Sequence, residues 1–485
     1  MPSWVVAHPW LTAFGVFVVA AAFTRRWLGR WGNRAAARAV LHFRARIDRF
    51  KLTRKPYVTA ALLADDRVAQ AVREHAMEHH VAKQRVWRRV ETYIDEIVPF
   101  FNIIAYYKIG HPISRALLNL FYKVTVEHAA PGAQSRLPKD AIVVYLMNHR
   151  SNADYVLVGY ALSGRVAISY AVGEWARAFP LEAIFKSFGS YFIRRRYREP
   201  LYHTVLERYV QLITKHGVTQ GIFPEGGLTR DGRLKPAKIG LLDYILGVGR
   251  EREARERMYL VPVAINYDRV LEDRSLLREA AAKEGRARPP RIVQAGEVLH
   301  YVLWNAARML GGRWKRYGRA AVTVGEPVPL APWFAAQERD GAPLFELPRP
   351  ERLARVQTLA DDAMSRIGAI VPVTPVPLAC AALQSLGADF VSRRAVLARM
   401  DEMRDVLLEL NARVLRADRD VAETFDRAWR MLKMRRVLVA EGEGYAVLEK
   451  GRPLIAYYAN SIAHLLGPFE AGVRKRDTLP MEAIL

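Results

Sequence analysis

Short apolar runs alternate with longer helical stretches through the middle of the chain, and this alternation constrains the fold more than any other feature. The clearest run, residues 141–147, is rich in β-branched residues and short enough to be a buried strand. Such alternation favours an α/β fold, in which a mixed sheet is flanked by helices. The predicted strands are residues 141–147, 166–172, 190–194, 219–224, 258–266 and 320–325, and the predicted helices between them are residues 155–162, 176–187, 199–216, 237–250 and 300–312.

The regions on either side of this α/β domain, which we place at residues 136–335, are predicted to be helical. Residues 31–95 are rich in Ala, Arg, Glu and Val and lack the alternation of a strand, and the helical N-terminal region is placed at residues 31–135. From residue 336, Pro and Gly introduce a mainly helical C-terminal domain that extends to residue 485. Within it, residues 393–432 have helical periodicity and residues 437–457 resemble a small hairpin.

An apolar segment near the start of the chain predicts a membrane anchor within residues 1–30. Residues 4–23 contain no Asp, Glu, Lys or Arg and are just long enough to cross a bilayer. Arginines follow the segment directly, so the positive-inside rule keeps the rest of the chain in the cytoplasm. A buried core helix is the alternative interpretation.

The charge of the chain limits the kinds of partner that suit it. The net charge of +25 and pI near 10.2 favour nucleic acid, anionic lipid, an acidic carrier protein or phosphorylated metabolites. The single cysteine, Cys380, excludes intramolecular disulfides and a cysteine-based zinc cluster.

His149 and Asp154 form the first candidate site, directly after the apolar run 141–147. A strand-to-helix turn at this position is where an open α/β sheet presents its ligand site. Five positions along a helix would separate the two side chains by about 140°. They can meet only if His149 lies before the helix and the chain folds back. A histidine oriented by a carboxylate is suited to general-base catalysis.

Three further stretches contain candidate binding residues. Residues 189–196 form a predicted strand that ends in Arg194, Arg195 and Arg196, which suit a phosphate, although a solvated basic turn is equally consistent.

Residues 221–233 form a predicted strand that breaks into a glycine-rich loop. Its backbone N–H groups can bind an anion, Glu225 can accept a hydrogen bond from a hydroxyl, and Arg230 and Arg233 supply charge. The loop lacks the Gly-Lys-Ser/Thr ending of a nucleotide-binding P-loop. In the third stretch, residues 258–268, Pro262 predicts an edge strand or a bulge, because proline cannot donate to a neighbouring strand.

These stretches resemble the four motifs of the glycerolipid acyltransferases, and they occur in the family's order. Residues 149–154 resemble the His-x4-Asp signature, 189–195 the second motif, 223–227 the third and 261–267 the fourth.

Within that superfamily, residues 225–238 are closest to the glycerol-3-phosphate and dihydroxyacetone-phosphate acyltransferases. Residues 457–466 are similar to the bacterial glycerol-3-phosphate branch. Leu228 stands where the family often has an arginine, and Asn152 where this branch often has a larger residue.

The resemblance implies an enzyme of phospholipid biosynthesis that transfers an acyl group from acyl-CoA or acyl carrier protein to the sn-1 hydroxyl of glycerol-3-phosphate. His149 would accept the hydroxyl proton and Asp154 would orient the imidazole, with no cofactor and no metal. Arg194, Arg195 and Arg230 would bind the phosphate, and the strand of Pro262 would line the acyl-donor channel. The full set of implied substrate-binding residues is Arg150, Ser151, Gly189, Arg194, Arg195, Arg196, Glu225, Gly226, Gly227, Arg230, Lys238 and Pro262.

The implied partners are the acyl donor, glycerol-3-phosphate and an anionic membrane surface. The implied location is the cell inner membrane, with the catalytic domain on the cytoplasmic face. The alternatives are an acyltransferase for dihydroxyacetone phosphate or a lysophospholipid, and a non-catalytic basic protein of the membrane surface. Nucleic-acid binding would rest mainly on charge, and the series of four motifs argues against it.

Overall fold

The structure, a computed structural model, describes residues 55–101, 106, 110–162, 168–173, 181–194, 197–283, 316–338 and 342–467. The predicted anchor at residues 4–23, the predicted helix at 300–312, and Arg195 and Arg196 lie outside these residues. Over the described ranges, no helix combines the length and the apolar character needed to cross a membrane.

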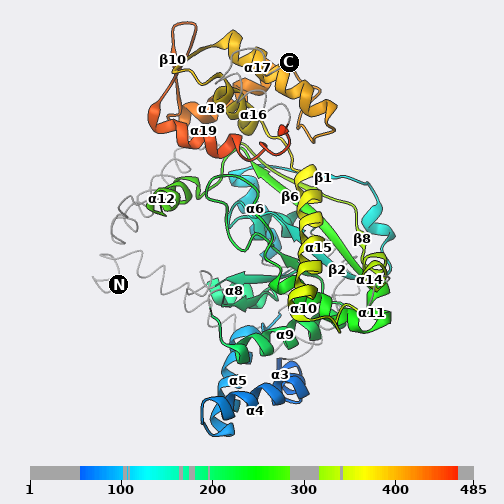
Figure 1. Cartoon of the computed structure of the whole chain (residues 1–485). Coiled ribbons are helices and arrows are strands. Elements are labelled where there is room, and N and C mark those ends of the chain that lie inside the picture. The colour runs from blue at the N-terminus through cyan, green and yellow to red at the C-terminus, as the bar shows by residue number, and fades with distance from the viewer. Residues whose placement is uncertain are drawn as a thin grey trace, which may run out of the picture.

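Within the described residues, an eight-stranded sheet lies at the centre of the molecule (Figure 1). Its strands are β1 (Lys123–His128), β2 (Ile142–Met147), β3 (Ser169–Gly173), β4 (Tyr191–Ile193), β5 (Gln220–Ile222), β6 (Met258–Tyr267), β7 (Arg319–Val324) and β8 (Val328–Pro329). The spatial order is β1-β7-β6-β2-β5-β3-β4, and β8 pairs with β6. The pairs β6–β2, β2–β5, β5–β3 and β3–β4 are all parallel. These five strands therefore place their carboxyl ends at one edge of the sheet, whereas β7 runs antiparallel to β6.

Helices cover both faces of this sheet. Strand β2 has alternating side chains, so Val143, Tyr145 and Met147 pack into one hydrophobic cluster, and its other residues pack into a second. The first cluster includes residues of α7 (Asp154–Ala161) and of α16 (Pro375–Leu386). The second cluster includes residues of the helices α3 (Lys55–Leu63), α4 (Asp66–Glu78), α5 (Lys83–Ile97), α9 (Pro200–Lys215), α10 (Gly240–Leu246) and α15 (Arg349–Ala369).

The C-terminal region packs on the same core as the sheet. It consists of α16, α17 (Arg393–Glu409), α18 (Val421–Met434), α19 (Arg452–Ala459) and a small sheet of β9 (Phe390–Ser392), β10 (Leu438–Glu441) and β11 (Gly444–Val447). In Figure 1 these orange and red elements lie at the end of the molecule opposite the blue helices α3 to α5. Shorter elements complete the described chain: α6 (His111–Phe121), η3 (Ala133–Arg136), α8 (Leu181–Ser187), η5 (Gly247–Arg250), α11 (Arg252–Arg257), α12 (Asp273–Lys283), α14 (Ala331–Glu338) and η6 (Glu449–Gly451).

The α/β fold with a mixed sheet flanked by helices is confirmed, and each of the six predicted strands overlaps an observed one. The helical prediction for residues 31–135 is wrong at β1, which pairs with β7 at one side of the sheet. The helical stretch predicted at 393–432 consists of two helices, α17 and α18. Between them Asn411 and Arg416 have positive φ, which an α-helix does not allow. The predicted hairpin is present as β10 and β11.

The prediction that Pro262 lies on an edge strand or at a bulge is wrong. Strand β6 lies inside the sheet, and its register with β2 is continuous through Pro262. On its other side, β8 pairs with residues up to Leu260 and β7 with residues from Val263. Pro262 thus occupies the position where the neighbouring strand changes, so the missing N–H group interrupts no ladder there.

Candidate active site

The chain connections define where a ligand site is expected on this sheet. After β2 the chain crosses to β3 on one side, and after β5 it crosses to β6 on the other side. The loops after β2 and β5, which are adjacent strands, therefore diverge, and such a switch point is where open α/β sheets bind ligands. His149 lies in the loop after β2, and Glu225 lies in the loop after β5.

His149 and Asp154 are in direct contact at this switch point. His149 precedes α7 and Asp154 is its first residue, so the chain folds back as the spacing required. The imidazole Nδ1 lies 3.0 Å from Asp154 Oδ2, and both side chains are buried. An Nδ1–H that donates to the carboxylate leaves Nε2 as the basic nitrogen. The pair therefore has the geometry of an oriented general base.

The Asp154 carboxylate is held by three further donors. Oδ2 also accepts hydrogen bonds from the backbone N–H groups of Arg150 and Ser151, at 2.7 and 3.0 Å. Oδ1 accepts a 2.6 Å hydrogen bond from the hydroxyl of Tyr267 at the end of β6. Burial raises the pKa of Tyr267 well above its usual value of 10, so this hydroxyl stays a donor. Tyr267 lies within the fourth motif, but no sequence pattern indicates its contact with Asp154.

Asn148 fixes the start of the loop after β2. Its side-chain amide donates to the carbonyl of Ile265 at 2.9 Å and accepts from the Ile265 N–H at 2.7 Å. These two bonds extend the pairing of β2 with β6 beyond its last registered pair, Met147 and Val263. His149 therefore follows directly after a position anchored to the sheet. A polar residue immediately after an apolar run was the only sequence signal for this role.

The loop after β5 encloses His149. The Phe223 ring stacks on the imidazole with centroids 4.0 Å apart, and Tyr155 meets it edge-on at 5.6 Å. The His149 N–H donates to Glu225 Oε1 at 2.9 Å, and the Thr229 N–H donates to the His149 carbonyl at 3.2 Å. The two loops are therefore joined through the backbone of His149.

Glu225 has an unusual environment. Its side chain is buried, and Oε2 has no hydrogen-bond partner among the described residues. Burial raises the pKa of Glu225 to about 7, against the opposing effects of the His149 N–H, Arg150 and Lys235. A buried carboxyl oxygen of this kind can accept or share the proton of a substrate hydroxyl.

The glycine turn after Glu225 brings basic residues close to it. Gly226 has φ +68°, a conformation that favours glycine, and a Cβ there would displace the Lys238 side chain, whose Cδ would be 2.6 Å away. Gly227 follows, and its carbonyl and that of Leu228 accept hydrogen bonds from Lys235 Nζ. Lys238 itself is exposed.

Two predicted substrate-binding residues make contacts within the protein. Arg150 is buried and donates from Nη1 to the Gly232 carbonyl at 2.6 Å and from Nη2 to the Ser461 carbonyl at 3.0 Å. Ser151 donates from its hydroxyl to Glu272 at 2.7 Å. Both residues therefore join the loop after β2 to distant parts of the chain.

The second motif lies farther from His149. Arg194 follows β4, three strands from β2, which corresponds to roughly 14 Å. Its guanidinium forms two hydrogen bonds with Glu96, at 2.8 and 2.5 Å, and lies over the ring of Tyr197. Phosphate binding by Arg194 would therefore compete with Glu96. Gly189 precedes β4, at the amino ends of the parallel strands, so the structure does not bring it to His149.

The remaining predicted residues lie near the site or in the core. Arg230 is partly exposed and pairs with Glu279 of α12 at 3.1 Å. Pro262 is buried in β6, and its ring lies against Gly325, where a Cβ would be only 2.6 Å away. Within the described ranges, no group of three or more His, Cys, Asp and Glu side chains is placed to hold a metal ion.

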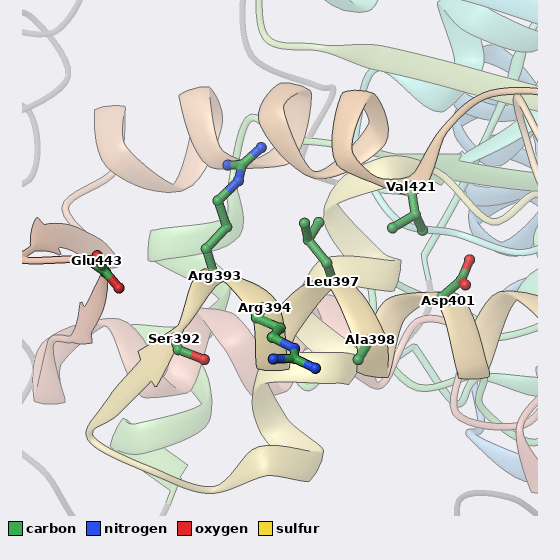
Figure 2. Close-up of a pocket in the computed structure, with 8 residues that line it drawn as sticks. All are labelled: Ser392, Arg393, Arg394, Leu397, Ala398, Asp401, Val421 and Glu443. Atoms are coloured by element: carbon green, nitrogen blue, oxygen red, sulfur yellow. The ribbon is translucent and has the colours of Figure 1, made fainter.

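A pocket of about 600 Å³ lies elsewhere, in the C-terminal region (Figure 2). It is lined by Ser392, Arg393, Arg394, Leu397, Ala398, Asp401, Val421 and Glu443. Because none of these residues comes from the loops after β2 and β5, this pocket is separate from the candidate active site.

Comparison with known proteins identifies two family regions. The family model described as "Acyltransferase" matches residues 132–266, which include the loops after β2 and β5. The family model described as "Glycerol-3-phosphate acyltransferase C-terminal region" matches residues 303–468. The two models therefore divide the chain near the end of β6.

Several curated relatives carry the name glycerol-3-phosphate acyltransferase. The one from Aeromonas hydrophila is 28% identical over 429 residues, covering 86% of this chain and 50% of that protein. The one from Xanthomonas campestris is 27% identical, covering 83% of this chain and 45% of that protein. The one from Pseudoalteromonas atlantica is 26% identical, covering 84% of this chain and 49% of that protein. The chain thus spans about half the length of the curated relatives it matches.

Among solved structures, the chain is similar to the 1-acyl-sn-glycerophosphate (LPA) acyltransferase of Thermotoga maritima. That match has 18% identity and a TM-score of 0.30, and it covers 54% of this chain and 79% of that chain. Both family models and the named relatives agree, so the chain is similar to glycerol-3-phosphate acyltransferases over both matched regions.

Proposed function

We propose that this protein transfers a fatty acyl group from acyl-CoA or acyl carrier protein to the sn-1 hydroxyl of glycerol-3-phosphate. The product would be lysophosphatidic acid, a precursor in phospholipid biosynthesis. The observation that carries the proposal is the contact between His149 Nδ1 and Asp154 Oδ2 at the switch point of an acyltransferase-family sheet.

The proposed reaction follows from the tautomer of His149. Nε2 accepts the proton of the acceptor hydroxyl while the hydroxyl oxygen attacks the thioester carbon. The tetrahedral intermediate collapses as the C–S bond breaks, and the imidazolium returns its proton to the departing thiolate. Because the thioester is already activated, the proposed reaction needs no cofactor and no covalent acyl-enzyme.

The surroundings of His149 are suited to this chemistry. The Asp154 carboxylate, fixed by Tyr267 and by two backbone N–H groups, stabilises the imidazolium that forms when the proton is accepted. Phe223 and Tyr155 pack against the imidazole and limit the access of water to it.

In this proposal the loop after β5 binds the polar acceptor. Glu225 Oε2 accepts a hydrogen bond from an acceptor hydroxyl, supported by Gly226 and Gly227 at the turn. The partly exposed Arg230 and the exposed Lys238 bind the phosphate. Arg194, Arg195 and Arg196 remain predicted contributors to phosphate binding, with Glu96 as the competitor at Arg194.

The proposal includes association with the cytoplasmic face of the cell inner membrane. The apolar residues 4–23 and the net charge of +25 both support contact with an anionic bilayer. The full-length chain should sediment with vesicles that contain phosphatidylglycerol. Binding that needs the apolar segment would survive high salt, whereas purely electrostatic binding would be lost.

The direct test is transfer of radiolabelled acyl groups to a panel of acceptors by the full chain. We expect product from glycerol-3-phosphate with wild type and with the control His216→Ala, an exposed histidine of the α9 end. His149→Ala should fold normally and form no product. If His149→Ala kept most of the wild-type activity, the proposed mechanism would be wrong. If only dihydroxyacetone phosphate or only lysophosphatidate gave product, that compound would replace glycerol-3-phosphate as the proposed acceptor.

A further inference from the structure

The C-terminal segment Tyr457–His464 contacts the loops after β2 and β5. The Ser461 carbonyl accepts a hydrogen bond from Arg150 of the loop after β2. Asn460 donates from its side-chain amide to the Asp231 carbonyl in the loop after β5, at 2.8 Å. Next to Asp231, Gly232 approaches the Tyr457 carbonyl so closely that a Cβ would lie 1.9 Å from that oxygen. A segment from the second family region therefore forms one wall beside the site.

Two neighbouring tyrosines of this segment differ in their hydrogen bonding. The Tyr458 hydroxyl donates to Asp273 Oδ2 at 2.6 Å and accepts from the Val270 N–H at 3.0 Å. The Tyr457 side chain is equally buried, but its hydroxyl has no hydrogen-bond partner within the described part of the chain. Leaving a buried hydroxyl without a partner costs free energy, so this group is expected to have a partner in the working enzyme.

The charges around Tyr457 indicate what that partner is. Burial raises the pKa of Tyr457, Arg150 partly lowers it, and the carboxylates of Asp273, Glu272 and Asp154 raise it further. The hydroxyl is therefore protonated and acts as a donor. Burial disfavours a phosphate dianion at this position, and the three carboxylates oppose the attraction of Arg150, so a neutral oxygen is the better partner. The charge of Arg150 acts on both the Tyr457 hydroxyl and the Glu225 carboxylate, whose Oε2 also lacks a hydrogen-bond partner among the described residues.

We propose that the Tyr457 hydroxyl is a substrate-binding group that donates a hydrogen bond to the oxygen on the central carbon of the acceptor. The inference rests on the proposed function, in which His149 deprotonates the terminal hydroxyl of glycerol-3-phosphate. Tyr457 would then select acceptors that carry an oxygen next to the reacting hydroxymethyl group. It also gives the C-terminal family region a direct role in recognising the acceptor.

The test compares two conservative variants with two acceptors in the full chain. Tyr457→Phe and Tyr458→Phe each remove one buried hydroxyl from the same segment. Glycerol-3-phosphate carries the central oxygen, and propane-1,3-diol monophosphate lacks it. We expect Tyr457→Phe to raise KM for glycerol-3-phosphate roughly tenfold and to leave kcat/KM for the diol phosphate unchanged. Tyr458→Phe should lower the melting temperature and leave both KM values unchanged.

A binding measurement separates a substrate contact from a structural effect. In the His149→Ala background, glycerol-3-phosphate should raise the melting temperature less when Tyr457→Phe is added, because a weaker ligand stabilises less. Tyr457→Phe without ligand should melt no lower than its parent.

Three outcomes would overturn the inference. They are an unchanged KM for glycerol-3-phosphate, an equal loss with both acceptors, or a lower melting temperature of the unliganded variant. If wild type makes no product from glycerol-3-phosphate, the proposed function fails first, and this inference fails with it.

Discussion

At the scale of single residues, the site depends on how Asp154 is held. A buried carboxylate is costly unless donors surround it, and here His149, Tyr267 and two backbone N–H groups supply four hydrogen bonds. Three of these donors converge on one oxygen, Oδ2. That oxygen both orients the imidazole and shapes the turn before α7, so it links the catalytic geometry to the local backbone.

Asp154→Asn is expected to abolish most acyl transfer while the protein stays folded. An amide in either orientation places its NH2 group against hydrogen-bond donors, and it removes the charge that stabilises the imidazolium. We expect kcat to fall by about 10³ to 10⁴, the size of effect known for histidine–aspartate pairs. Initial rates would measure kcat, and circular dichroism would show whether the variant is folded. Asp140→Asn, at an exposed aspartate, serves as the control. A fall in kcat below tenfold would contradict the assigned role.

Glu225 is expected to make stability depend on pH. Burial raises its pKa from 4.5 to about 7, so the folded state binds more protons than the unfolded state between these values. The contribution of the protonated Glu225 carboxyl to the free energy of unfolding is therefore present at low pH and is lost as the pH rises through about 7. Over the full titration the free energy of unfolding should fall by about 3 kcal/mol.

Glu225→Gln removes this titration but keeps an oxygen that can accept from the His149 N–H. Urea unfolding between pH 5 and 8 should show that wild type loses stability relative to the variant as the pH rises. If the free energies of unfolding of wild type and Glu225→Gln changed in parallel with pH, Glu225 would not titrate in this range.

At the scale of elements, the loops after β2 and β5 are fixed by non-local contacts. Asn148 holds the first loop to β6, and Arg150 holds it to Gly232 and Ser461. Gly232 has φ +86° and lies against the carbonyl of Tyr457. The loop after β5 can reach the C-terminal segment because this residue has no side chain.

Gly232→Ala is therefore expected to disrupt the structure far more than Gly132→Ala. Gly132 also has positive φ, at +79°, but a Cβ there would meet nothing within 4 Å. Gly132→Ala should cost about 1 kcal/mol for the backbone alone. Gly232→Ala should cost several times more and also lower acyl transfer, because Tyr457 or the loop must move. Equal losses in the two variants, measured by urea unfolding, would argue against a tight contact.

The elements also show which parts of the structure the sequence can predict. Strand β2 was predictable because its apolar residues are consecutive, and all six are buried. Strand β1 was missed because it lies at one side of the sheet and all six of its residues stay at least partly exposed. The meeting of His149 with Asp154 is local, and so the motif was sufficient to predict it.

The contacts that were not predictable join residues far apart in the chain. Arg194 pairs with Glu96, 98 positions away, and Tyr267 reaches Asp154 across 113 positions. No periodicity encodes such pairs, because they depend on the order of the strands. The position of Pro262 inside the sheet has the same origin, since it depends on where β7 and β8 end.

At the scale of the whole molecule, the C-terminal region and the sheet form one hydrophobic cluster. Buried charges also join them: Asp273 of α12 binds Arg435 after α18 and the Tyr458 hydroxyl of α19. The shared core predicts that the two regions unfold together in a single transition.

Arg435→Met tests this coupling. It leaves Asp273 buried without its cation, which typically costs about 3–5 kcal/mol. The control Lys215→Met breaks an exposed pair with Glu251 and should cost less than about 1 kcal/mol. Urea unfolding followed by tryptophan fluorescence and by circular dichroism should give coincident curves. Two separate transitions in wild type would show that the regions fold independently.

The hydrogen bond from Arg150 to Ser461 joins residues 311 positions apart. During translation at about 5–20 residues per second, roughly 15–60 s pass between the synthesis of these two residues. Through that interval Arg150, the neighbour of the proposed general base His149, lacks one of its two carbonyl partners. A nascent chain released before Ser461 would carry all four motifs and still lack a wall of its site. Completion of the site is thereby tied to completion of the C-terminal region.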